Sequence, residues 1–268
     1  MHVGALSILW PAVEPPLRDS ADAPPGSVEG MNARLVLSDP AAATDLLTFA
    51  SRAAALDEPL VRLQAAEGVL IATAAPLAPA SLIDATPTVL GMRVSRVDPE
   101  VECDLVIAAD ELAAGTDAEI VLPERGRRAA WAGISPPRGG WAPLEPVSIA
   151  TLRDVAERGI AVVAREAVPG LGEDLVRRIR ARVWGEGASE LGGLPAGVAF
   201  AATALGFFGA AATADPAADA AATPAAASGQ ARVWASGPWT RIALPGGHVL
   251  TRARTTAGLT AVRRTGDA

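Results

Sequence analysis

The longest uncharged stretch of the chain, residues 191–214, decides whether this sequence folds in water or in a membrane. It is long enough to cross a bilayer, but it consists mostly of Ala and Gly and is bounded by Glu190 and Asp215 rather than by basic residues. Its large apolar side chains recur at helical spacing: Leu194, Val198, Leu205 and Phe208. The stretch predicts a buried core helix over residues 191–209, which we favour over a membrane span.

The charge of the chain is unevenly distributed. All 23 basic residues are Arg, and Tyr is absent, a bias that GC-rich codon usage explains. The net charge is −7, yet residues 1–120 carry 18 acids and 6 Arg, whereas residues 121–268 carry 12 acids and 17 Arg. Either the two halves attract each other or the second half binds an anionic partner, and we favour the first. An overall acidic chain argues against non-specific nucleic-acid binding.

The inventory of cysteine and histidine excludes several kinds of site. Cys103 is the only cysteine, so there is no internal disulfide, and its place in a strand-like run favours an inert, buried thiol. His2 and His248 are the only histidines, which argues against a zinc cluster. We therefore predict no metal, no cofactor and a cytoplasmic location.

Residues 1–30 and 31–123 differ in pattern. The first thirty are rich in Pro and Asp, lack a hydrophobic period, and make a poor signal peptide, so we expect a disordered extension, with Met1 or Met31 as the true start. Residues 31–123 predict an α+β domain. Its helix begins at Pro40 after an Asp39 cap, and its strands cover these ranges: 60–64, 69–75, 89–97, 103–108 and 119–122. In residues 89–97 we expect Leu90, Met92 and Val94 to point inward, and Arg93 and Ser95 outward.

The remainder of the chain divides into three parts. Residues 124–209 combine a Trp/Gly-rich loop with central helices over 148–166 and 172–184, and residues 210–230 form an Ala/Pro linker. Residues 231–268 predict an antiparallel β-meander with strands over these ranges: 231–236, 239–244, 249–253 and 259–263. The fold class is therefore α+β, with a small N-terminal sheet unit, central helices and a C-terminal meander.

Two Gly-Gly pairs mark the candidate binding residues. Arg138 precedes Gly139-Gly140, whose backbone amides could cradle an anion, and His248 follows Gly246-Gly247. The ligand-binding residues we predict are Arg138, Gly139, Gly140, Trp141, Arg241 and His248. The alternative is structural: Trp131 and Trp141 anchor an irregular loop to the core. No nucleophile, base and carboxylate are found in a recognisable arrangement, so we predict no catalytic residue. The arginines of residues 177–182 lack interleaved aromatics and predict a solvated or intramolecularly paired helix face.

Several segments resemble a known but functionally unassigned group. They are Ala130–Trp141, Arg182–Trp184, Leu194–Phe200, Trp239–Arg241 and Gly247–Leu250. Together they resemble an uncharacterised family of hypothetical proteins from GC-rich actinobacteria, over residues 31 to about 254. The resemblance implies no activity and no catalytic residue.

Two functions remain open on the sequence. The first is a non-enzymatic cytoplasmic interaction or scaffold protein with a protein partner, no nucleic acid and no membrane. The alternative is an enzyme or sensor that binds a small anionic ligand between the Gly-rich loop and the C-terminal sheet.

Overall fold

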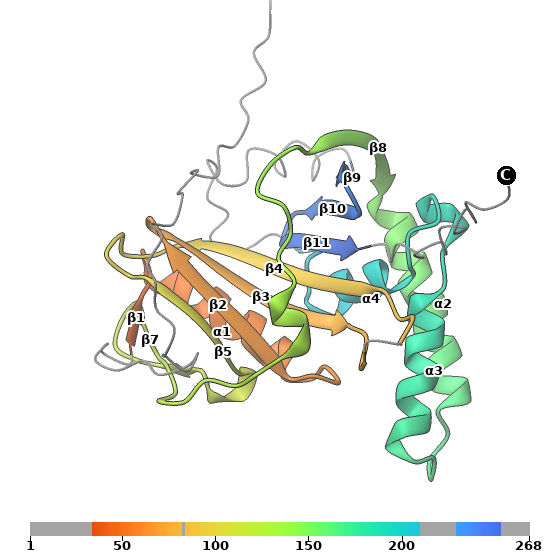
Figure 1. Ribbon diagram of the computed structural model, residues 1–268, viewed down its shortest axis with the longest axis horizontal. Coiled ribbons are helices and arrows are strands. Elements are labelled where there is room, and N and C mark those ends of the chain that lie inside the picture. Colours follow the sequence, from red (N-terminus) through yellow and green to blue (C-terminus); the bar gives the residue numbers. More distant parts are fainter. Residues whose placement is uncertain (1–33, 82–83, 210–228, 253–268) are drawn as a thin grey trace, which may run out of the picture.

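A computed structural model describes residues 34–81, 84–209 and 229–252, and it confirms the α+β class. Its main element is an eight-stranded antiparallel sheet with the strand order β5-β2-β3-β4-β11-β10-β9-β8 (Figure 1). The strands of this sheet are β2 (Leu60–Ala66), β3 (Val69–Leu77), β4 (Thr88–Arg96), β5 (Cys103–Ala108), β8 (Ala142–Ser148), β9 (Gln230–Ser236), β10 (Trp239–Leu244) and β11 (Gly247–Arg252). A second sheet has the order β1-β7-β6, from β1 (Arg34–Val36), β7 (Glu119–Val121) and β6 (Ala113–Ala114).

The N-terminal elements form where the sequence predicts them. Helix α1 (Pro40–Ala53) begins at proline, and the Asp39 carboxylate accepts a hydrogen bond from the Ala42 amide at 2.8 Å. The hairpin of β2 and β3 turns at Glu67 and Gly68, both of which have positive φ. Local signals, a cap and a turn, therefore suffice to define this part of the fold.

The N-terminal and C-terminal strands join in one sheet through β4 and β11. The register pairs His248 with Met92 and Leu250 with Leu90. The sequence predicted the C-terminal meander, and β9, β10 and β11 confirm it, although β11 begins at Gly247 rather than residue 249. The fourth predicted strand, residues 259–263, lies outside the described residues, as do residues 1–30 and most of the linker. The seam between the two parts has no local sequence signal, because it depends on pairing between distant strands.

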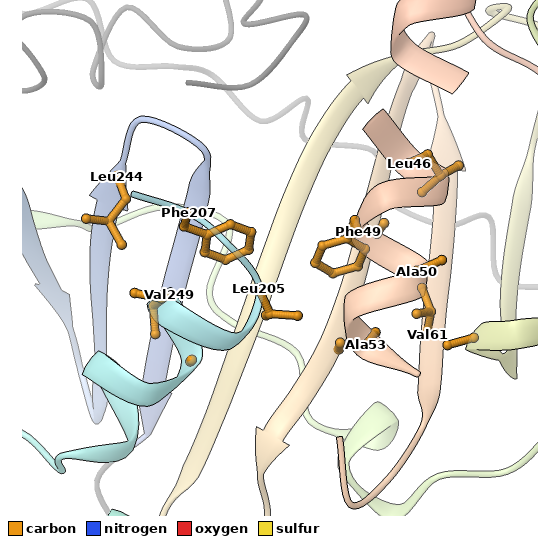
Figure 2. Close-up of a cluster of buried hydrophobic side chains, with 14 of the residues drawn as sticks. Leu46, Phe49, Ala50, Ala53, Val61, Leu205, Phe207, Leu244 and Val249 are labelled. Atoms are coloured by element: carbon orange, nitrogen blue, oxygen red, sulfur yellow. The ribbon is translucent and has the colours of Figure 1, made fainter. Parts of the chain in front are cut away.

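One face of the sheet is covered by helix α1 and by helix α4 (Gly197–Ala204) with the turn that follows it. Phe49 and Phe207 are completely buried, and their parallel rings lie 6.2 Å apart at the centre of this core (Figure 2). A Cβ atom on Gly91 of β4 would come within 1.9 Å of Leu205, so glycine is what allows the chain to approach the sheet here. The helical face therefore contains the main hydrophobic core.

The inward and outward sides of β4 are the reverse of the prediction. Arg93 and Ser95 lie on the helical face and are buried, whereas Leu90 and Met92 face the opposite side. Arg93 Nε lies 3.1 Å from the Asp45 carboxylate of α1, and its guanidinium carbon lies 5.6 Å from the centroid of the Phe207 ring. A buried Arg is tolerated because a buried acid compensates its charge. Alternation gave the correct period but could not decide which side was the core, since both sides of β4 are covered.

The central helices are α2 (Ile149–Glu166) and α3 (Glu173–Gly185), which form a hairpin extending from the body of the molecule (Figure 1). Leu175 of α3 is 46% exposed. The described part of the uncharged stretch, residues 191–209, contributes side chains to the core as predicted, but its α-helix has only 8 residues, since turns precede and follow it. No helix in the part of the chain that the structure describes is long and apolar enough to cross a membrane.

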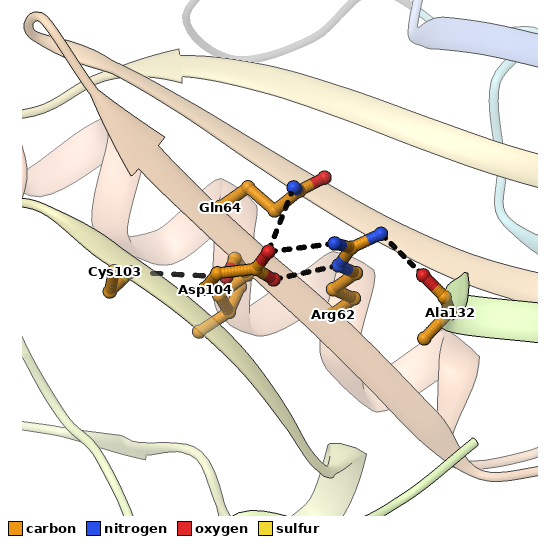
Figure 3. A network of polar contacts seen from close by, with 6 residues as sticks. Arg62, Gln64, Cys103, Asp104 and Ala132 are labelled. Atoms are coloured by element: carbon orange, nitrogen blue, oxygen red, sulfur yellow. Dashed lines mark hydrogen bonds and ion pairs between the residues drawn. The ribbon is translucent and has the colours of Figure 1, made fainter. Parts of the chain in front are cut away.

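The opposite face of the sheet is crossed by an irregular segment, residues 125–141, which we call the strap (Figure 1). The Arg127 amide donates to Val106 of edge strand β5, and the strap then leads into β8 at the other edge. Midway, Arg62 donates to the Ala132 carbonyl oxygen at 2.6 Å and to both carboxylate oxygens of Asp104 at 2.7 Å (Figure 3). The sequence predicted a loop here but missed β8, because prolines interrupt its alternation.

Candidate functional site

The register of the meander places a set of basic and aromatic residues on the face that the strap crosses. Arg241 of β10 pairs with Trp234 of β9 and with Leu250 of β11, and direct cross-strand partners point to the same side of a sheet. His248 pairs with Ala243, two residues from Arg241 and therefore on this face as well. We call this the strap face.

The guanidinium of Arg241 lies between two indole rings. Its central carbon is 5.0 Å from the ring centroid of Trp141, which the strap supplies, and 4.6 Å from that of Trp234. Both distances are within the range of cation–π attraction. Trp141 is held in turn by a hydrogen bond of 3.2 Å from its indole N–H to the Pro137 carbonyl oxygen. The two rings therefore fix the orientation of the cation.

Three buried polar atoms on or against this face have no hydrogen-bond partner among the described residues: Arg241 Nε, His248 Nδ1 and Trp131 Nε1. Buried polar groups are normally satisfied, because an unmade hydrogen bond costs about 1–3 kcal/mol. Trp131 packs with Trp239 and Leu250 in the apolar layer beneath the strap. On the helical face, Thr251 Oγ1 also has no partner among the described residues, so the strap face differs in that two of its three atoms belong to the basic residues Arg241 and His248.

The electrostatic environment here is cationic. Burial lowers the pKa of Arg241 below its usual value. Burial, with Arg241 and Arg93 nearby, lowers the pKa of His248 to about 4, so its imidazole is neutral at pH 7. These shifts arise from desolvation and neighbouring cations, whereas a nearby carboxylate would raise both pKa values.

The structure brings together only part of the predicted set. Trp141, Arg241 and His248 lie on one face, as described above. Gly139 lies at the edge of this group, where its carbonyl oxygen accepts a hydrogen bond of 3.1 Å from the Ser236 hydroxyl. Gly140 has a φ of +72°, a conformation that favours glycine. Arg138 is exposed.

Sequence analysis missed Trp234, Arg232 and Arg252. Arg232 pairs with Ala243 and Arg252 with Trp239, so both arginines share the strap face. The signal was present in two alternating tripeptides, Arg232-Val-Trp234 and Trp239-Thr-Arg241, in which the basic and aromatic residues occupy the same side of each strand.

Other candidate groups have structural explanations. Three arginines of α3 form ion pairs, Arg177 with Asp174, Arg180 with Asp57 and Arg182 with Glu166, which confirms the prediction of a paired face. Cys103 is half-buried, and burial raises the pKa of its thiol. Among the described residues, no group of three or more His, Cys, Asp or Glu side chains could hold a metal ion.

Comparisons with known proteins give a family context without a function. Residues 31–133 match a family described as Domain of unknown function (DUF8010), and residues 136–256 match another, Domain of unknown function (DUF8185). These matches support an uncharacterised family. No curated protein matches the chain. A solved structure, Caulobacter crescentus pol III beta, is similar at a TM-score of 0.41 and 11% identity, over 82% of this chain and 64% of that chain. At that TM-score the similarity carries no argument.

Proposed function

We propose that this chain, which combines two domains of unknown function, is a binding protein whose strap face takes a small anionic ligand. The observation that carries the proposal is Arg241, a cation that lies between Trp141 and Trp234 and whose buried Nε has no partner within residues 34–81, 84–209 and 229–252. A buried charge is costly unless an opposite charge compensates it. An anionic ligand would supply that compensation.

The chemistry of the site suits a carboxylate or a phosphate. A guanidinium offers planar, paired N–H donors that match the oxygens of either group, and the two indoles hold that plane in place before the ligand arrives. His248 contributes a neutral imidazole, which can donate one hydrogen bond and accept another. Pre-organisation of this kind lowers the entropic cost of binding.

We propose binding without catalysis. The charged groups that shift the pKa of His248 are Arg241 and Arg93, whereas a catalytic histidine is commonly oriented by a carboxylate. The proposal also places the protein in the cytoplasm, since a chain with one cysteine lacks the disulfide framework of small secreted domains.

The test is a titration with inorganic phosphate and with citrate, followed by tryptophan fluorescence and by thermal melting. We expect binding to change the emission of Trp141 and Trp234 and to raise Tm with ligand concentration. Arg241→Met should abolish both effects, and Arg158→Met, which removes an exposed arginine from α2, should not. Equal responses in the two variants would contradict the proposal.

A second candidate, an interaction or scaffold role, is favoured by the α2–α3 hairpin. Ile160, Val168 and Leu175 on this hairpin are 42%, 51% and 46% exposed, respectively. A second copy of the chain packed on this hairpin would remove these exposed apolar side chains from water. Concentration-dependent self-association that Val168→Asp and Leu175→Asp abolish would support this role, and a monomer at all concentrations would contradict it.

A further inference from the structure

The strap face extends the basic and aromatic character of the Arg241 site across three neighbouring strands. Arg232, Arg241 and Arg252 lie on β9, β10 and β11, with Arg252 exposed and the other two half-buried. Trp234 is also half-buried, and Trp141 reaches the same place from the strap. Adjacent strands are about 4.8 Å apart, so the three arginines form a track rather than a single point of charge.

The meander segment of this face contains no acid: residues 229–252 contain three Arg and neither Asp nor Glu. The strap contains four Arg, of which Arg127 is paired with Glu111, and on the same face Asp104 is paired with Arg62. The net charge of −7 therefore conceals a local excess of positive charge on the face where these segments meet. Local charge, not the chain average, determines which ligand a surface attracts.

We infer that the strap face binds single-stranded nucleic acid, an inference that rests on the proposed anion site and names its ligand class. Arginines that follow a backbone of phosphates, interleaved with aromatic rings on which bases stack, are the shared features of surfaces that bind single strands. Three of the four arginines of helix α3 are paired with acids, and its one aromatic residue, Trp184, is buried. The meander has both features on one side of the sheet.

Each kind of residue has a distinct role in this inference. Arg241 binds one phosphate from a fixed orientation, and Arg232 and Arg252 bind its neighbours along the strand. Trp234 and Trp141 each present an indole to Arg241, and their exposed portions offer the surface on which a base stacks. Stacking tolerates any base, so we expect little sequence preference.

The experiment measures binding of a fluorescein-labelled oligothymidylate, about ten nucleotides long, to the full chain by fluorescence anisotropy. If three phosphates are neutralised, raising the salt from about 50 to about 200 mM should weaken binding roughly 10- to 20-fold. Arg232→Ala combined with Arg252→Ala should weaken binding at low salt and flatten this salt dependence. Trp234→Leu should weaken binding roughly tenfold or more through lost stacking.

Controls separate this inference from the proposed anion site. Arg158→Ala removes one exposed arginine from α2 and should leave the affinity unchanged. A duplex of the same length that binds as tightly as the single strand would overturn the inference. If phosphate binds and oligothymidylate does not, the inference fails while the proposed function stands. If neither binds, both fail. The salt dependence is measured on the unaltered chain, so the test holds even where a variant does not fold.

Discussion

The two faces of the eight-stranded sheet are closed in different ways. On the helical face, α1 and the region of α4 bury Phe49, Leu205 and Phe207 completely, and the buried cation Arg93 is compensated by Asp45. On the strap face, an irregular segment covers a thin apolar layer, and a second cation, Arg241, is held by aromatic rings while its Nε lacks a partner.

This difference assigns separate roles to the two faces. In a regular helix the backbone N–H and C=O groups are hydrogen-bonded to each other, so only side chains face the sheet, and these can pack into a dense core. An irregular strap leaves backbone and side-chain polar groups for other partners, and such segments commonly carry function on a rigid scaffold. We therefore expect the largest losses of stability from substitutions on the helical face, and losses of binding from substitutions at Arg241 and its neighbours on the strap face.

The largest expected effect is on the helical face. Phe49→Ala removes a fully buried ring and should lower the free energy of unfolding by about 3–5 kcal/mol, measured by urea denaturation. Leu144→Ala, at a position that is 50% exposed, is the control and should change it by less than about 0.5 kcal/mol. A loss below about 1 kcal/mol for Phe49→Ala would show that this face is not the main core.

The next effect concerns pH and the strap face. His248 has a pKa of about 4 in the folded chain, below its unfolded value near 6.5, so the unfolded chain binds the proton first as the pH falls. Stability should therefore decrease from pH 6.5 towards pH 4, by about 2 kcal/mol at pH 5 relative to pH 7. The measurement compares the free energy of unfolding of the unaltered chain and of His248→Gln as a function of pH. The decrease that His248 causes should be absent from the variant. Parallel pH profiles for the two proteins would contradict the burial of His248.

A smaller effect tests how the strap is attached. Arg62 is 15% exposed and links Asp104 to the Ala132 carbonyl oxygen. Arg62→Ala should therefore lower the free energy of unfolding by about 1–2 kcal/mol and increase hydrogen exchange in residues 129–133. Arg34→Ala breaks a more exposed pair with Glu119 and should cost less than about 1 kcal/mol, without any change in the strap. Unchanged exchange in the Arg62 variant would mean that the apolar layer alone holds the strap.

The sequence predicted the helical face better than the strap face. The Asp39 cap, the Glu67-Gly68 turn and the meander turns are local signals, and the elements that they mark are present. Strand β8 and the β4–β11 seam depend on distant partners, which a local period does not reveal. The two sides of β4 were assigned the wrong way round for the same reason: the strap, a distant segment, covers the side that would otherwise be exposed.

The candidate site was predicted in part for a related reason. Trp141 and His248, which adjoin glycine pairs, and Arg241 were among the predicted residues and do lie on one face. Trp234 did not stand out, because only the β9–β10 register places it opposite Arg241. A strand's alternation shows which of its own residues share a side, but pairing is needed to show which residues of different strands meet.

The most direct test of the central claim, that Arg241 on the strap face serves binding and not stability, is the free energy of unfolding of Arg241→Met without ligand. Methionine keeps the apolar stem between Trp141 and Trp234 and removes the buried charge. Our account predicts a stability within about 1 kcal/mol of the unaltered chain, or higher, together with loss of anion binding. A loss of about 3 kcal/mol or more, comparable to that of Phe49→Ala, would show that Arg241 is a structural residue and would contradict the account.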